Sequence, residues 1–198
     1  MKTLDYYNEN AEAFVQGTLN ADMSEHYQRF LACLPPRSSI LDLGCGSGRD
    51  TLYFLSQGYA VEATDGSEEV CKLAANIIGK PVRCLRFEDL DYQSAFDGIW
   101  ACASLLHVPK ADMPAIMQLV SRAIKVNGVL YTSFKYGAGE AYKGDRFFNY
   151  YTENDIAILL KDTGLQCKEY WVSEDVRQDR KDERWLNLIA VKESSAQE

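Results

Sequence analysis

The sequence predicts a single α/β domain in which helices cover both faces of a mostly parallel, doubly wound sheet. Two observations support this prediction. Short apolar runs alternate along the chain with segments whose apolar residues recur at helical spacing, and glycine or proline stands at many of the joints between them. Strand–helix alternation of this kind predicts parallel strands joined by right-handed crossovers, which leaves only a few doubly wound topologies.

Length and composition fit one well-buried core. The chain has 198 residues, of which 46% are hydrophobic and 25% charged. This is enough for one domain and short for two. We expect the domain to span residues 1–192 and the polar residues 193–198 to form a frayed tail.

The elements are expected in the following order. Two amphipathic helices, 4–16 and 23–34, come first, and Pro35 and Pro36 end the second one. The expected strands are 39–43, 60–64, 82–87, 96–101, 128–134, 166–172 and 185–191. The expected helices between them are 49–57, 68–78, 112–124 and 153–163. Such sheets bind ligands beyond the carboxyl ends of their strands, so we expect the functional residues there.

Charge and cysteine usage argue against several classes of partner. The net charge of −8 argues against tight binding to duplex DNA or structured RNA, which needs clustered lysine and arginine. No apolar run is long enough to span a membrane, and the N-terminal segment lacks the apolar core of a signal peptide. The six cysteines are scattered and form no C-x-x-C pair, so we expect reduced thiols, no metal site and a cytoplasmic protein.

The strongest local signal is the segment ILDLGCGSG, residues 40–48, in which a buried strand runs into three alternating glycines. Glycines at such a turn let a ligand approach the backbone closely because no Cβ is in the way. The dinucleotide fingerprint G-x-G-x-x-G would place its last glycine at position 49, where this chain has Arg49. The turn therefore favours a nucleoside without phosphates.

This segment resembles the first motif of the class I S-adenosylmethionine-dependent methyltransferases, and the similarity covers about residues 38–135 in order. The resemblance implies a Rossmann-like, seven-stranded sheet with an antiparallel last strand, an N-terminal helical lid, and S-adenosyl-L-methionine as the cofactor. On this basis the domain divides into a helical cap (1–36), a cofactor-binding core (37–135) and a substrate-side region (136–192).

The resemblance also assigns roles at the glycine turn. It implies that Gly44 and Gly46 contact the cofactor through their backbone, and that Asp42 holds the loop or, through water, the methionine amino group. A side chain that only caps the turn is the alternative for Asp42. Arg49 is unfavourable beside a helix N-terminus, so we expect it to serve the cofactor carboxylate, the alternative being a surface arginine paired with Asp50.

Acidic residues follow the next two strands. Asp65, about 20 residues past the glycines, is placed to accept hydrogen bonds from the ribose, with Gly66 and Ser67 beside it; it could instead cap the following helix. Asp89 matches the residue that accepts from the adenine amino group in the family, with Glu88 and Leu90 as neighbours. The alternative for Asp89 is a solvated turn residue.

The loop after strand 96–101 contains Ala103, Ser104 and His107, where family members carry residues near the transferred methyl group. Ala103 is expected to contact the cofactor. His107 is the candidate catalytic residue, as a proton acceptor, and a packed loop residue is the alternative.

Aromatic residues are expected to enclose the site. Tyr6 and Tyr7, with Phe14, would form a lid over the cofactor, unless they are only the apolar face of a docked helix. Residues 135–151 form an aromatic, glycine-containing segment expected to be a mobile acceptor wall, whose cations are Lys135, Lys143 and Arg146. The charged segment 174–184 is expected to be a solvated hairpin, the alternative being that Arg177 and Arg180 reach an acidic substrate.

The sequence thus predicts methyl transfer to a small-molecule acceptor by in-line displacement, in a monomer or homodimer. A tRNA-modifying methyltransferase, a non-catalytic S-adenosylmethionine-binding module and an NAD-dependent oxidoreductase are the alternatives. The acidic net charge disfavours the first, and Arg49 in place of a third glycine disfavours the last.

Overall fold

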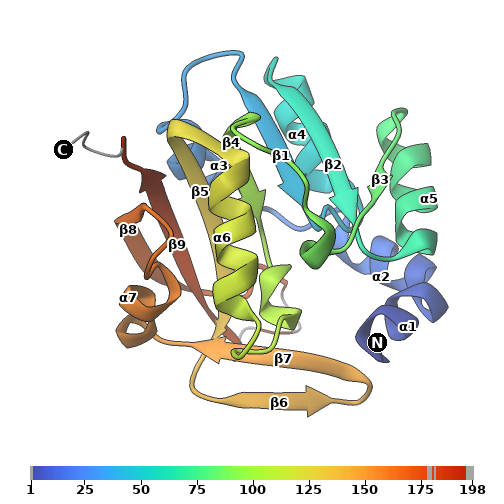
Figure 1. Ribbon diagram of the computed structural model, residues 1–198. Coiled ribbons are helices and arrows are strands. Elements are labelled where there is room, and N and C mark those ends of the chain that lie inside the picture. The colour runs from blue at the N-terminus through green and yellow to red at the C-terminus, as the bar shows by residue number, and fades with distance from the viewer. Residues whose placement is uncertain (1, 178–179, 181, 195–198) are drawn as a thin grey trace.

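In the computed structural model, residues 2–177, 180 and 182–194 are described. They form a nine-stranded sheet with the order β3-β2-β1-β4-β5-β7-β6, in which β9 also pairs with β5 and β8 pairs with β9 (Figure 1). The strands are β1 (Ser39–Leu43), β2 (Ala60–Asp65), β3 (Arg83–Cys84), β4 (Phe96–Ala101), β5 (Ile124–Tyr136), β6 (Glu140–Lys143), β7 (Arg146–Tyr151), β8 (Leu165–Glu174) and β9 (Arg184–Lys192).

Helices connect and cover these strands. The α-helices are α1 (Lys2–Glu9), α2 (Ala11–Thr18), α3 (Ser24–Leu31), α4 (Arg49–Ser56), α5 (Glu68–Ile78), α6 (Met113–Ala123) and α7 (Ile156–Leu159). Short 3₁₀ turns are η1 (Phe87–Asp89), η2 (Leu105–His107) and η3 (Glu153–Asp155).

Alternating side chains of the central strands build a core on each face of the sheet. On β4, Ile99 points into the cluster formed with α6, whereas Trp100 points into the cluster formed with α3 and α4. Trp100 is fully buried and stacks on Tyr131 of β5 at 3.9 Å between ring centroids. This two-sided burial is what strands covered on both faces require.

The predicted fold class is confirmed. The strand pairs β1–β2, β1–β4, β2–β3 and β4–β5 are parallel, and the last strand, β9, runs antiparallel to β5. The carboxyl ends of β1, β2 and β4 therefore lie at the same edge of the sheet, and the N-terminal helices dock beside that edge (Figure 1).

The structure adds two strands to the seven expected ones, because residues 140–151 form a hairpin where a mobile segment was expected. In this hairpin Ala141 pairs with Phe148 and Tyr142 with Phe147, and Gly144 supplies a positive φ in the turn. The β7 strand also adds to the end of β5. Aromatic residues favour strands, so the aromatic residues of this segment also indicated a strand.

Several boundaries also differ. The first expected helix is two helices that meet at Asn10, where the backbone leaves the helical region (φ −116°, ψ 22°). The expected strand 82–87 has only two residues, and the expected helix 153–163 keeps one α-helical turn, α7, after η3. Most of the predicted frayed tail, residues 195–198, lies outside the described residues. Within the described chain, none of the helices is long and apolar enough to cross a bilayer.

Candidate cofactor and acceptor site

A cavity of about 760 Å³ opens at the carboxyl edge of the sheet. It runs between the glycine turn, the N-terminal helices and the β6–β7 hairpin. The predicted site residues that line it are Tyr6, Gly44, Gly46, Arg49, Asp65, Gly66, Glu88, Ala103 and His107. Residues far apart in sequence therefore converge on one space.

The glycine turn is packed closely on both sides. Gly44 has φ +79°, and a Cβ there would lie 2.5 Å from the Cβ of Ser104. Gly46 has φ +54°, and a Cβ there would lie 3.3 Å from the ring of Phe14. Side chains at either position would be strained as well as crowded, which explains why this turn requires glycine.

Asp65, at the end of β2, faces this turn. One of its oxygens accepts the Gly46 N–H at 3.0 Å, and the other accepts the Ser67 N–H at 3.0 Å. Burial raises the pKa of the carboxyl group above its ordinary value. Each carboxylate oxygen can accept more than one hydrogen bond, so the group retains capacity toward the cavity.

Ser67 and Asp42 do not line the cavity. Ser67 is fully buried and caps α5, because its Oγ accepts the Val70 N–H at 3.3 Å. Asp42 is buried under the turn, where its carboxylate accepts the Thr51 hydroxyl at 2.6 Å. Burial, helped by the nearby Asp50 carboxylate, raises the pKa of Asp42 to about 8.

Of the predicted residues that follow β3, likewise only some line the cavity. Glu88 is exposed and reaches the cavity, together with Arg86 and Phe87. Asp89 is exposed but lies outside the lining, and Leu90 is buried in the hydrophobic core. The structure therefore brings Glu88, rather than Asp89, to the candidate adenine end of the cavity.

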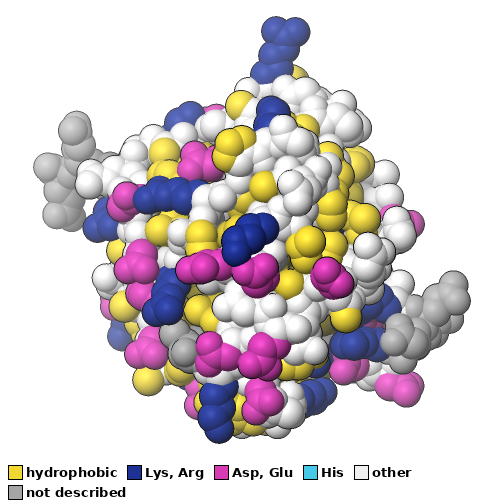
Figure 2. Space-filling model, turned by 90° about the vertical axis from the view of Figure 1, so that its right-hand side faces the viewer, with side chains coloured by type: hydrophobic (Ala, Val, Ile, Leu, Met, Phe, Trp, Pro, Cys, Tyr) yellow, Lys and Arg dark blue, Asp and Glu magenta, His cyan; other side chains and the backbone are white. Residues whose placement is uncertain are grey.

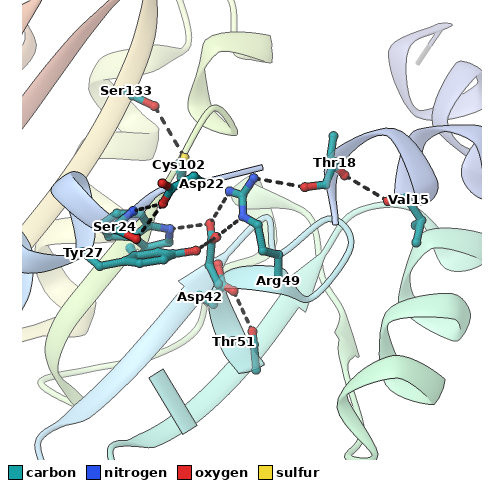
Figure 3. A network of polar contacts seen from close by, with 12 residues as sticks. Val15, Thr18, Asp22, Ser24, Tyr27, Asp42, Arg49, Thr51, Cys102 and Ser133 are labelled. Carbon is teal, nitrogen blue, oxygen red and sulfur yellow. Dashed lines mark hydrogen bonds and ion pairs between the residues drawn. The ribbon is translucent and has the colours of Figure 1, made fainter. Parts of the chain in front are cut away.

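Arg49 joins the sheet to the N-terminal helices (Figure 3). Its Nε donates to Asp50 at 2.6 Å, and its Nη1 donates to the Thr18 carbonyl at 3.2 Å. Asp50 is buried and also accepts from the Tyr27 hydroxyl at 2.5 Å and from the Trp100 Nε1 at 2.7 Å. The sequence offered a surface Arg49 paired with Asp50 as the alternative. The structure contains this ion pair, but as part of a buried network.

His107 has a defined tautomer. Its Nδ1 lies 2.6 Å from the Phe147 carbonyl oxygen, which can only accept, so Nδ1 carries the proton. Its Nε2 then accepts the Tyr7 hydroxyl at 2.9 Å. Burial, together with the nearby Arg146 and Lys135 cations, lowers the pKa of His107 to about 4. The ring is therefore neutral near pH 7, with a basic nitrogen facing the lid.

The N-terminal helices close over this region. Thr3 Oγ1 accepts the Phe147 N–H at 3.0 Å, and Asn8 Oδ1 accepts the Ser67 hydroxyl at 2.7 Å. Tyr6, Tyr7 and Phe14 all line the cavity, as the lid prediction requires.

The charged segment before β9 contributes residues that sequence reasoning missed. Glu183 pairs with Lys135 and Lys143, and all three line the cavity. Asp175 is buried and accepts from Arg177 and from the Trp185 Nε1. No local pattern in the sequence distinguishes these residues from a solvated charged turn.

Comparisons with known proteins find similarity to methyltransferases. A family model described as a methyltransferase domain matches residues 40–128. YqeM of Bacillus subtilis (strain 168), named provisionally as a methyltransferase, is 31% identical over 116 residues, 52% of this chain and 47% of YqeM. The chain thus spans about half the length of that relative. A methyltransferase of Staphylococcus carnosus (strain TM300) is 25% identical over 78% of this chain and 73% of its own length.

Solved structures share the fold. The 1,6-didemethyltoxoflavin-N1-methyltransferase of Burkholderia thailandensis, with bound 1,6-didemethyltoxoflavin and S-adenosylhomocysteine, has a TM-score of 0.79 and 24% identity, covering 96% of this chain and 87% of that one. A methyltransferase from Methanosarcina mazei has a TM-score of 0.75 and 21% identity, covering 87% and 99%.

Proposed function

We propose that the chain is a class I S-adenosylmethionine-dependent methyltransferase and that it methylates a small organic acceptor. One observation carries the proposal. A single cavity connects Asp65 and the glycine turn with a wall of aromatic and cationic side chains beyond His107. A cofactor site and an acceptor site would then share one enclosed space.

The residues at the glycine end fit S-adenosyl-L-methionine, the cofactor of this family. We assign Gly44 and Gly46 to the backbone wall of the site, and Asp65 to the ribose hydroxyls. Glu88 is assigned to the adenine end. The Ser104 hydroxyl is buried in the cavity lining without a hydrogen-bond partner, as expected of a wall that a polar ligand completes.

The bound cofactor would supply an electrophilic methyl group on a sulfonium, so the protein needs to align the acceptor and exclude water. We assign water exclusion to the helical cap, residues 1–36, closing on the core, residues 37–135. We assign acceptor binding to the region 136–192. His107 Nε2 would take the proton of an acceptor O–H or N–H, once the Tyr7 hydroxyl moves off it.

A small acceptor is favoured over a macromolecule because the cavity lies under the N-terminal helices. Its volume of about 760 Å³ is in the range of small-molecule sites, roughly 300–1,000 Å³. On the face shown in Figure 2, lysine and arginine side chains are scattered among acidic ones instead of forming a stripe. The Burkholderia neighbour supports the proposal, since its bound acceptor is also a small molecule.

Calorimetric titrations with S-adenosylhomocysteine and with NADH test the cofactor assignment. We expect S-adenosylhomocysteine to bind with a micromolar Kd and NADH not to bind. Tritiated methyl transfer from S-adenosylmethionine to a small-molecule extract and to bulk tRNA then tests the acceptor. Label in the small-molecule fraction supports the proposal. Label only in tRNA, or none at all from protein that binds the cofactor, overturns it in favour of a tRNA enzyme or a binding module.

A further inference from the structure

Arg146 occupies an unusual position in the acceptor half of the cavity. It begins β7 and lines the cavity near His107. Its guanidinium lies over the ring of Tyr6 at 4.7 Å and over the ring of Phe148 at 5.3 Å. The Nε–H is buried and has no hydrogen-bond partner. The aromatic rings hold the cation in place but leave this donor unsatisfied.

Other cations around the cavity have carboxylate partners. Lys135 and Lys143 pair with Glu183, and Arg49 pairs with Asp50. Among the described residues, no carboxylate lies within ion-pair distance of Arg146. The chain carries 29 acidic residues against 21 basic ones, so carboxylates are not scarce. A guanidinium beside a cavity that has no carboxylate partner and an unsatisfied Nε–H is therefore a feature that a ligand anion would complete.

The surroundings of Arg146 indicate the shape of that ligand. The Phe148 ring lies 5.1 Å from the His107 ring, and Tyr7 packs edge-on against His107 at 5.4 Å. Flat side chains thus line the part of the cavity around the guanidinium and His107. Such a space favours a planar ligand, and the fork of a guanidinium matches a carboxylate with two parallel hydrogen bonds.

We propose that Arg146 binds a carboxylate on the methyl acceptor, so that the acceptor is a small planar carboxylic acid. The inference rests on the proposed function and goes further by naming the acceptor class. Holding the carboxylate at Arg146 would direct the remainder of the acceptor toward His107 and the end of β4.

Paired probes test this directly. Protein saturated with S-adenosylhomocysteine is titrated calorimetrically with benzoate, indole-2-carboxylate and quinoline-2-carboxylate, and with the primary carboxamide of each. At least one carboxylate should bind tenfold or more tightly than its amide. Arg146→Gln should reduce that ratio to about one, and Arg146→Lys should leave an intermediate ratio because a lysine keeps the charge but loses the fork.

Arg37→Gln is the matched control, since Arg37 is exposed before β1, at the opposite edge of the sheet, and its loss changes the net charge equally. The control should keep the wild-type ratio. Equal binding of every carboxylate and its amide to the wild type overturns the inference. A preference for carboxylate over amide that persists in Arg146→Gln also overturns it, because Arg146 would then only pack against Tyr6. Failure of wild-type protein to bind S-adenosylhomocysteine would instead refute the proposed function.

Discussion

Replacing Asp65 by alanine should weaken cofactor binding. The carboxylate holds the Gly46 and Ser67 amides at 3.0 Å each, and Asp65 lines the cavity where we place the ribose. Losing a charged acceptor for the ribose hydroxyls should cost about 1–3 kcal/mol. At about 1.4 kcal/mol per tenfold change, the Kd should rise roughly 5- to 150-fold.

Calorimetric titration with S-adenosylhomocysteine measures this change, and thermal unfolding of the unliganded variant checks that it folds. Glu62→Ala is the control, because Glu62 lies on the same strand but is exposed and outside the cavity lining. Its Kd should match the wild type within about twofold, below 0.5 kcal/mol. An unchanged Kd for a folded Asp65→Ala protein would refute the ribose assignment and leave Asp65 as a residue that only fixes the glycine turn.

Three further predictions follow from the buried groups. His107→Ala should lower the rate of methyl transfer by about 100-fold or more while the cofactor Kd stays constant. The wild-type protein should keep its rate below pH 6, because the pKa of His107 is lowered to about 4. A His107→Ala protein that works at the wild-type rate would remove the catalytic role of His107. Tyr27→Phe deletes one of the donors to Asp50, so urea unfolding should show a loss of about 1.5–3 kcal/mol, and an unchanged midpoint would contradict the network's importance. The pKa of Asp42, raised to about 8, means that the folded state holds a proton that the unfolded state releases near pH 4, so stability should fall as pH rises from about 4 to about 8. Asp42→Asn should flatten that decline in urea titrations at pH 5 and 8, whereas an unchanged slope would assign it to other groups.

Local patterns in the sequence determined the architecture and the position of the glycine turn in the candidate site. The glycines at 44, 46 and 48 adopt positive φ, which few other residues tolerate, so the turn could be recognised from residue types alone. Asp65 followed from its spacing to that turn, because parallel strands end at one edge of a sheet. The elements and the turn depend on periodicity and backbone conformation, both of which are encoded over a few neighbouring residues, whereas the cofactor was inferred from the resemblance to the methyltransferase family.

Only the tertiary structure decided how individual side chains are used. Ser67 and Asp42 sit within the predicted motifs, yet packing directs one to a helix cap and buries the other beneath the turn. Arg146 contacts Tyr6, which is distant from it in the sequence, and the β6–β7 hairpin that carries Arg146 is anchored by pairing with β5. Such contacts depend on how distant elements pack together, and for that reason no short stretch of sequence contains them.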